Sequence, residues 1–244
     1  MVLGGAWATN RVVSLTSAIL LAALTALSLT LAFLRLPPAE EVARLRRWAY
    51  RSIILIEWWL AALYLILLRA DGWSWSRLGL WVDAREWQSD LLWATGVTLA
   101  ALAFGELCWR LARHRGWSGR DLVEALLPRS PQEKRLALGL AVTAGCCEEL
   151  LYRGFLIPAL DEFFHVAVAS GISVLLFALA HAPYGRLGLV SSLGGGILLA
   201  AAFLATGRLL APVLAHIAYD CYAFFSGRLQ TVENYTCTRM NTHR

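Results

Sequence analysis

Residues 130–160, SPQEKRLALGLAVTAGCCEELLYRGFLIPAL, decide the fold because they join a clear helix start to a long apolar run that contains charged side chains. The stretch opens at Ser130 with a hydroxyl cap, a proline at the first helical position and a glutamate at the third. At 1.5 Å per residue, Glu148 and Glu149 lie about 25 Å further along the helix axis. The stretch therefore predicts one helix that carries two carboxylates well inside a bilayer.

The rest of the chain also has the composition of a membrane protein. Of its 244 residues, 58% are hydrophobic and only 16% are charged, which lies outside the balance of a soluble globular domain. Apolar runs near the roughly 20 residues that a spanning helix needs are flanked by Arg, Asp and Glu. We expect them at 12–34, 52–68, 91–109, 136–160, 163–182, 187–206 and 209–225. The expected fold class is all-α, a multi-pass transmembrane helical bundle of about seven spans.

These runs divide the chain into three parts. Residues 1–130 are expected to form N-terminal transmembrane helices and a basic cytoplasmic loop, residues 131–227 a helical core made by the last four spans, and residues 228–244 a polar tail. Most Lys and Arg residues fall on one side of this arrangement, so the positive-inside rule predicts the N-terminus outside and the C-terminus inside. Basic residues on the cytoplasmic side, where they face anionic lipid, explain the net charge of +5. No nucleic-acid partner is therefore expected.

The second glutamate of this helix has a partner on its own helix, whereas the first has none. Glu149 and Arg153 are four residues apart, so they share a helix face and can pair, while Glu148 points about 100° away. An uncompensated charge inside a bilayer costs at least ~3 kcal/mol. These residues therefore predict a polar cavity in which Glu148 is available for chemistry or for a partner helix.

Two later apolar runs each supply a histidine. His181 closes the segment Phe-Ala-Leu-Ala-His, and His216 begins the segment His-Ile-Ala-Tyr-Asp, which places Asp220 four residues later. At that spacing Asp220 can accept a proton from His216, or both can face one cavity. A single intramembrane histidine can be a core hydrogen-bonding residue, but two of them together with two glutamates indicate one functional site.

The ordered trio of motifs resembles the CPBP family, which comprises the CAAX prenyl endoproteases and the bacterial bacteriocin-processing and immunity proteins, also called the Abi family. The motifs are Glu-Glu-x-x-x-Arg at 148–153, Phe-x-x-x-His at 177–181 and His-x-x-x-Asp at 216–220. The resemblance covers about residues 136–225. It implies an all-helical intramembrane endopeptidase whose substrate is a membrane-anchored protein or peptide, lipidated or transmembrane. It also implies a location in the bilayer, by analogy the cytoplasmic membrane of a bacterium.

The resemblance also assigns roles to residues. It implies that the catalytic residues are Glu148, Glu149, His181 and His216, supported by Arg153 and Phe177. The sequence departs from the prenyl endoproteases at Asp220, where those proteins resemble His-x-x-x-Asn. An ionised carboxylate cannot donate a hydrogen bond to an oxyanion as an amide can, which leaves orientation of His216 or metal ligation as the expected role of Asp220.

Two mechanisms remain open at this stage. In the glutamic type, Glu148 acts as general base on a water shared with His181, His216 stabilises the oxyanion, and Arg153 holds Glu149. In the metal-dependent type, zinc would be held by residues from the set His181, His216, Glu148 and Asp220, with one position left for water.

Two other functional classes would place similar residues in a membrane. A non-catalytic immunity or binding scaffold keeps the polar site without turnover and predicts losses at motif positions. A proton-coupled transporter predicts a polar path through both leaflets and an inverted repeat, and the sequence contains no evident repeat. The peptidase therefore remains the main hypothesis.

Overall fold

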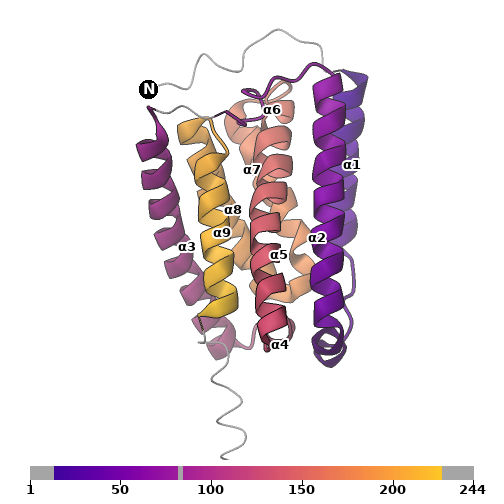
Figure 1. The fold of residues 1–244 in the computed structure, drawn as a ribbon, viewed down its shortest axis with the longest axis vertical. Coiled ribbons are helices and arrows are strands. Elements are labelled where there is room, and N and C mark those ends of the chain that lie inside the picture. The colour runs from indigo at the N-terminus through magenta and orange to yellow at the C-terminus, as the bar shows by residue number, and fades with distance from the viewer. Residues whose placement is uncertain (1–13, 82–84, 227–244) are drawn as a thin grey trace, which may run out of the picture.

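The protein is a bundle of helices, seen in a computed structural model that describes residues 14–81 and 85–226. Within those residues the secondary structure is entirely helical (Figure 1). The elements in chain order are α1 (Leu15–Ala32), α2 (Ala39–Ala70), α3 (Trp87–Arg115), α4 (Arg120–Ala125), α5 (Pro131–Glu149), the π-helix η1 (Leu150–Leu156), α6 (Ile157–Leu160), α7 (Val166–Ala180), the short 3₁₀-helix η2 (Ala182–Tyr184), α8 (Gly185–Thr206) and α9 (Leu210–Phe225). The expected polar tail, 228–244, lies outside the described residues.

The expectation of seven spans is confirmed only in part. Within the described residues, four helical segments are long and apolar enough to cross a membrane: Leu15–Ala32, Ala39–Ala70, Trp87–Arg115 and Ala182–Thr206. The helices α7 and α9 are apolar but shorter. The run expected at 136–160 is not among the four, because charged side chains interrupt it. The integral membrane character nevertheless follows from the apolar helices.

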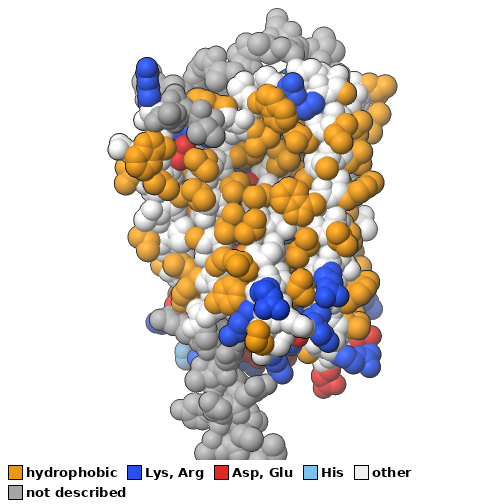
Figure 2. All heavy atoms as spheres, viewed as in Figure 1, with side chains coloured by type: hydrophobic (Ala, Val, Ile, Leu, Met, Phe, Trp, Pro, Cys, Tyr) orange, Lys and Arg blue, Asp and Glu red, His pale blue; other side chains and the backbone are white. Residues whose placement is uncertain are grey.

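The long helices stand side by side, and α5 lies between α2 and α9 (Figure 1). Helix α3 packs against α8 and α9, and α7 packs against α1 and α8. The start of α5, α4 and the end of α9 lie at one end of the bundle, and α6 lies at the other. On the face shown in Figure 2, hydrophobic side chains cover the middle of the bundle, and most of the Lys and Arg side chains gather at the end that holds α4.

The helix start predicted at Ser130 is confirmed as a complete capping box. The Ser130 hydroxyl accepts a hydrogen bond from the Glu133 backbone N–H at 3.2 Å, and the Glu133 carboxylate accepts from the Ser130 backbone N–H at 3.1 Å. Arg46 of α2 pairs with the same carboxylate at 3.2 Å. Partial burial raises the pKa of Glu133, but the backbone hydrogen bonds and the Arg46 charge outweigh that effect and lower the pKa below the ordinary value of a glutamate.

We therefore expect Glu133→Gln to lower the free energy of unfolding at pH 7 by about 1–2 kcal/mol, since hydrogen bonds to a charged acceptor are lost. Because the folded-state pKa is lowered, the carboxylate stabilises the protein above the unfolded pKa, and this contribution disappears as the pH falls through the folded pKa. The difference in melting temperature between Glu133→Gln and wild type, measured in detergent, should therefore shrink on acidification. Glu41→Gln, which changes an exposed partner of Arg44, is the control and should show no such trend.

The expectation of one regular α-helix from 130 to 160 is wrong over seven residues, where the chain forms the π-helix η1. Every residue of η1 is buried, and Phe155 contacts Trp73 with ring centroids 5.5 Å apart. A Cβ atom added to Gly154 would lie 2.8 Å from the carbonyl oxygen of Leu78, so glycine permits the connection between α2 and α3 to pass close to η1. Apolar patterning gives no sign of this wider turn because a fully buried helix segment has no polar face.

Candidate active site

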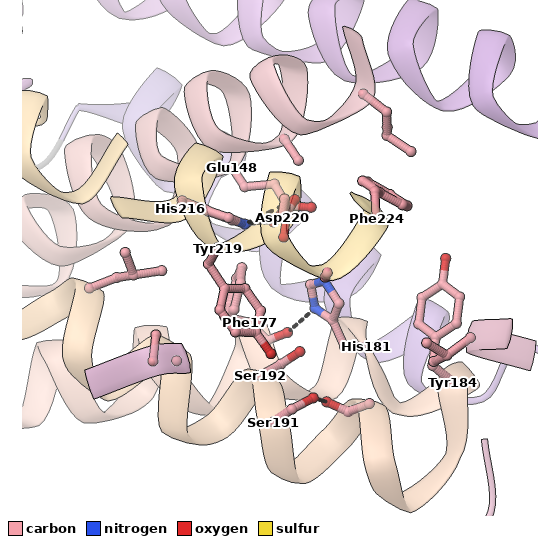
Figure 3. A pocket seen from close by; sticks show the side chains of 18 of the residues that line it. Glu148, Phe177, His181, Tyr184, Ser191, Ser192, His216, Tyr219, Asp220 and Phe224 are labelled. Carbon is pink, nitrogen blue, oxygen red and sulfur yellow. Dashed lines mark hydrogen bonds and ion pairs between the residues drawn. The ribbon is translucent and has the colours of Figure 1, made fainter. Parts of the chain in front are cut away.

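A cavity of about 280 Å³ lies inside the bundle, between α2, α3, α5, α7, α8 and α9. Most of its wall is apolar, but acidic and histidine side chains line it from α2, α5, α9 and the end of α7. Figure 3 shows those of α5, α9 and the end of α7. The acidic and histidine residues of the wall are Glu57, Glu148, His181, His216 and Asp220. Intramembrane charges cluster where they line a cavity or pair with one another, so this is the candidate site.

Behind the cavity wall, Glu149 joins an arginine to a histidine. Its Oε1 atom accepts a hydrogen bond from Arg153 Nη1 at 2.7 Å and another from His216 Nδ1 at 2.8 Å. The side chains of Glu149 and Arg153 are both fully buried. Since the carboxylate accepts from Nδ1–H, His216 is held with its other nitrogen, Nε2, toward the cavity.

Arg153 is itself fixed by two further contacts. Its Nη2 atom donates to the carbonyl oxygen of Gly196 at 3.2 Å, and its guanidinium carbon lies 4.5 Å from the ring centroid of Phe177. A cation over an aromatic face is stabilised by the ring quadrupole. The sequence predicted the pair with Glu149 from the i, i+4 spacing, but the contact with Phe177 joins two separate motifs and depends on how α7 packs.

His181 lies at the C-terminal end of α7, across the cavity from the helix that carries Glu148 (Figure 3). Its Nδ1–H donates to the carbonyl oxygen of Phe177 at 2.9 Å, and its ring lies 4.7 Å from that of Phe177. With the proton on Nδ1, the neutral ring leaves Nε2 as a hydrogen-bond acceptor. His181 can thus orient a water in the cavity.

Glu148 and Asp220 both lie near the edge of the His216 ring that carries Nε2. The Nε2 atom of His216 is 3.8 Å from Glu148 Oε2 and 3.8 Å from Asp220 Oδ2, which is ion-pair range but too long for a hydrogen bond. The sequence suggested Asp220 as the group that orients His216, whereas the structure places Glu149 at hydrogen-bonding distance. Glu148 Oε2 is buried and has no hydrogen-bond partner.

The structure does not fit a preformed zinc site. Among the described residues, no group of three or more His, Cys, Asp and Glu side chains is placed to hold a metal ion. Each site histidine uses Nδ1 in a hydrogen bond and keeps Nε2 for the cavity, an orientation that a metal-bound histidine also has. Glu148 and Asp220 each lie 3.8 Å from His216 Nε2.

Glu57 is the one acidic member of the cavity wall that the motif analysis did not include. It lies in the middle of α2, within the apolar run 52–68. The signal was present, because an ionisable residue inside a spanning run is a functional-site candidate. It was missed because it has no charged partner at helical spacing and belongs to no motif.

Comparison with known proteins points to the same part of the chain. Residues 132–222 match the family model described as type II CAAX prenyl endopeptidase, Rce1-like. The matched segment contains all three motifs and confirms the family that they resemble. The comparisons with curated proteins and with solved structures found no match.

Proposed function

We propose that the chain is an intramembrane endopeptidase of the glutamic type, because residues 132–222 match the Rce1-like, type II CAAX prenyl endopeptidase family model. Its substrate is a membrane-anchored protein or peptide, and a water activated by Glu148 and His181 hydrolyses one peptide bond. One observation carries this proposal: Glu148 presents a buried carboxylate oxygen without a hydrogen-bond partner to the cavity that His181 also lines.

The first step is attack of water on the substrate carbonyl. The Glu148 carboxylate removes one proton from the water, and His181 Nε2 accepts a hydrogen bond from the other. The water oxygen then bonds to the carbonyl carbon, and the carbonyl oxygen becomes an oxyanion. In the second step the protonated Glu148 gives its proton to the amide nitrogen as the carbon–nitrogen bond breaks, which releases an amine and restores the carboxylate.

The oxyanion is stabilised by His216. Protonated at both nitrogens, its ring donates Nδ1–H to Glu149 and offers Nε2–H to the oxyanion. Glu149 stabilises that imidazolium and fixes its direction, as the carboxylate does in catalytic triads. Asp220, 3.8 Å from Nε2, adds negative charge near the imidazolium and cannot itself donate while ionised.

The site is reached from the end of the bundle that holds α4. The cavity wall extends from Glu148 and His216 to Tyr50, Leu126 and Phe224, and α4 and the end of α9 lie at that end. The basic side chains of Figure 2 gather there too, so the positive-inside rule makes it the cytoplasmic end. We infer an N-out, C-in protein of a bacterial cytoplasmic membrane.

The decisive experiment compares tagged membrane proteomes from wild-type cells and from cells with Glu148→Ala. The proposal expects membrane-anchored proteins whose cleaved forms are present in the wild type and missing in the variant. A candidate substrate found in this way is then cleaved by the purified protein in detergent. If the two proteomes contain the same cleavage products, the chain acts as a scaffold rather than as a peptidase.

Chelation tests the choice of mechanism. If the side chains alone activate the water, dialysis of the purified protein against EDTA and 1,10-phenanthroline should leave kcat unchanged. The control is the same dialysis followed by addition of zinc, which should add no activity. Loss of turnover on chelation with recovery on zinc addition would instead support the metal-dependent type.

A further inference from the structure

Glu57 belongs to the inner face of α2, although its neighbours in sequence face outward. Ile56 and Trp59 are 62% and 67% exposed, and in a bilayer they would contact lipid. Ala61 and Tyr64, four and seven residues after Glu57, are buried. This helical spacing puts Glu57 on the stripe that packs against the rest of the bundle, where it lines the cavity together with Glu148.

Two polar contacts fix α2 against α5 on either side of this position. Trp58 Nε1 donates to Thr143 Oγ1 at 3.0 Å, and Arg46 pairs with Glu133 at 3.2 Å nearer the end of the bundle. Thr143 and Glu148 lie on the same helix, five residues apart. These contacts hold the part of α2 that carries Glu57 at the cavity wall.

Two carboxyl oxygens that face this cavity from different helices are both buried without a hydrogen-bond partner: Glu57 Oε2 and Glu148 Oε2. A buried polar atom without a partner is costly, and buried carboxyl groups normally find a donor. A proton on one of the two carboxyls would satisfy both oxygens at once, directly or through one water.

The charges around Glu57 favour this arrangement. The charged groups that act on it are Glu148 on α5 and His216 and Asp220 on α9. Three other titratable groups interact electrostatically with Glu57: Cys147, Tyr152 and Tyr184. If Glu57 were ionised, a third carboxylate would stand in the cavity beside Glu148 and Asp220, opposite one imidazolium. Carboxylates that share a low-dielectric site disfavour one another's ionisation.

We propose that Glu57 is a positioning residue of the active site: a neutral carboxylic acid on α2 that donates a hydrogen bond to the carboxylate of Glu148. The inference rests on the proposed peptidase function. Glu57 lies outside residues 132–222, so the N-terminal helices would complete the site rather than merely enclose it. The hydrogen bond keeps the general base pointed at the water and removes the repulsion between two facing carboxylates.

The test uses the full-length protein in detergent with Glu57→Gln and Glu57→Leu, and Glu41→Gln on the exposed side of α2 as the matched control. Glutamine keeps a neutral donor, so kcat should stay within about threefold of wild type, since the hydrogen bond is retained. Leucine removes the donor, and kcat should fall about tenfold or more, the loss of one hydrogen bond to a charged group. KM should remain unchanged in both variants, and the melting temperature of Glu57→Gln should stay that of the wild type.

A second readout does not depend on turnover. The infrared spectrum of the wild type should contain the carbonyl band of a protonated carboxylic acid, and Glu57→Gln should lose intensity in that band while Glu41→Gln retains it. The proposal is overturned if Glu57→Leu keeps wild-type kcat, if Glu57→Gln loses as much activity as Glu57→Leu, or if the band is unchanged in Glu57→Gln. If the wild type cleaves no membrane-anchored substrate, the peptidase function fails, and the infrared band still decides whether Glu57 is protonated.

Discussion

Glu148→Gln should abolish proteolysis and leave the melting temperature of the protein unchanged. Glutamine has the shape and hydrogen-bonding reach of glutamate but cannot take a proton from water, so the loss falls on the chemical step. A positioned general base typically contributes about 10²–10⁴-fold to the rate. The fold should tolerate the change because the amide oxygen of glutamine can still accept a hydrogen bond, and the 3.8 Å from Glu148 Oε2 to His216 Nε2 is too long for a hydrogen bond to be lost there.

The measurement is cleavage of a membrane-anchored substrate by purified protein, with melting followed in the same detergent. The matched control is Glu106→Gln, a glutamate of α3 that pairs with Arg110 at 2.8 Å near the protein surface; it should retain wild-type turnover. If Glu148→Gln keeps near-wild-type turnover, the assignment of the general base is wrong. A metal-bound water activated by another carboxylate would then explain the activity better.

Arg153→Ala should damage both stability and activity. The substitution removes the guanidinium from a fully buried pair with Glu149, and breaking such a pair costs about 3–5 kcal/mol because the remaining charge is left uncompensated. It also removes the contacts with Gly196 and Phe177. Activity should fall because Glu149 then no longer has a fixed position from which to orient His216.

Melting in detergent measures the loss of stability. The control is Arg110→Ala, because Arg110 is two-thirds exposed in its pair with Glu106, and such a pair should contribute less than about 1 kcal/mol. A double variant, Glu149→Gln with Arg153→Met, removes both charges and should regain most of the stability. It should remain inactive because the His216 imidazolium has lost its carboxylate. Equal melting temperatures for Arg153→Ala and Arg110→Ala would show that the buried pair does not hold the fold together.

Contacts within one helix could be predicted from spacing, whereas contacts between helices could not. The capping box at Ser130 and the pair of Glu149 with Arg153 each lie within one turn, so the sequence contains their geometry. The partner of His216 was uncertain because Asp220 and Glu149 compete for it, and only the packing of α9 on α5 decides in favour of Glu149. The roles proposed for these residues remain predictions.

Other features depended on properties that a local pattern does not contain. Glu57 lacks a partner on its own helix, so its place in the cavity follows only from the contact of α2 with α5. The π-helix lies in a buried segment that is apolar except for Arg153. Because polar and apolar residues do not alternate there, their spacing cannot tell a π-helix from an α-helix. The span at 136–160 was predicted from the length of its apolar run. The charged residues of the site interrupt that run, so it is not among the four candidate spans.

The π-helix also makes the number of residues between the two halves of this helix a functional constraint. A turn that bonds residue i to i+5 accommodates one residue more than an α-helical turn. Deleting a single residue between Leu150 and Leu156 could restore regular α-helix without losing backbone hydrogen bonds. The narrower turn would leave the helices on either side in phase, but the side chains inside it would change direction, since each residue of an α-helix turns by about 100°. Arg153 and Phe155 lie in this turn, so we expect their contacts with Glu149 and Trp73 to be lost. Length variation should therefore be tolerated in the loops of this protein and not within this buried segment.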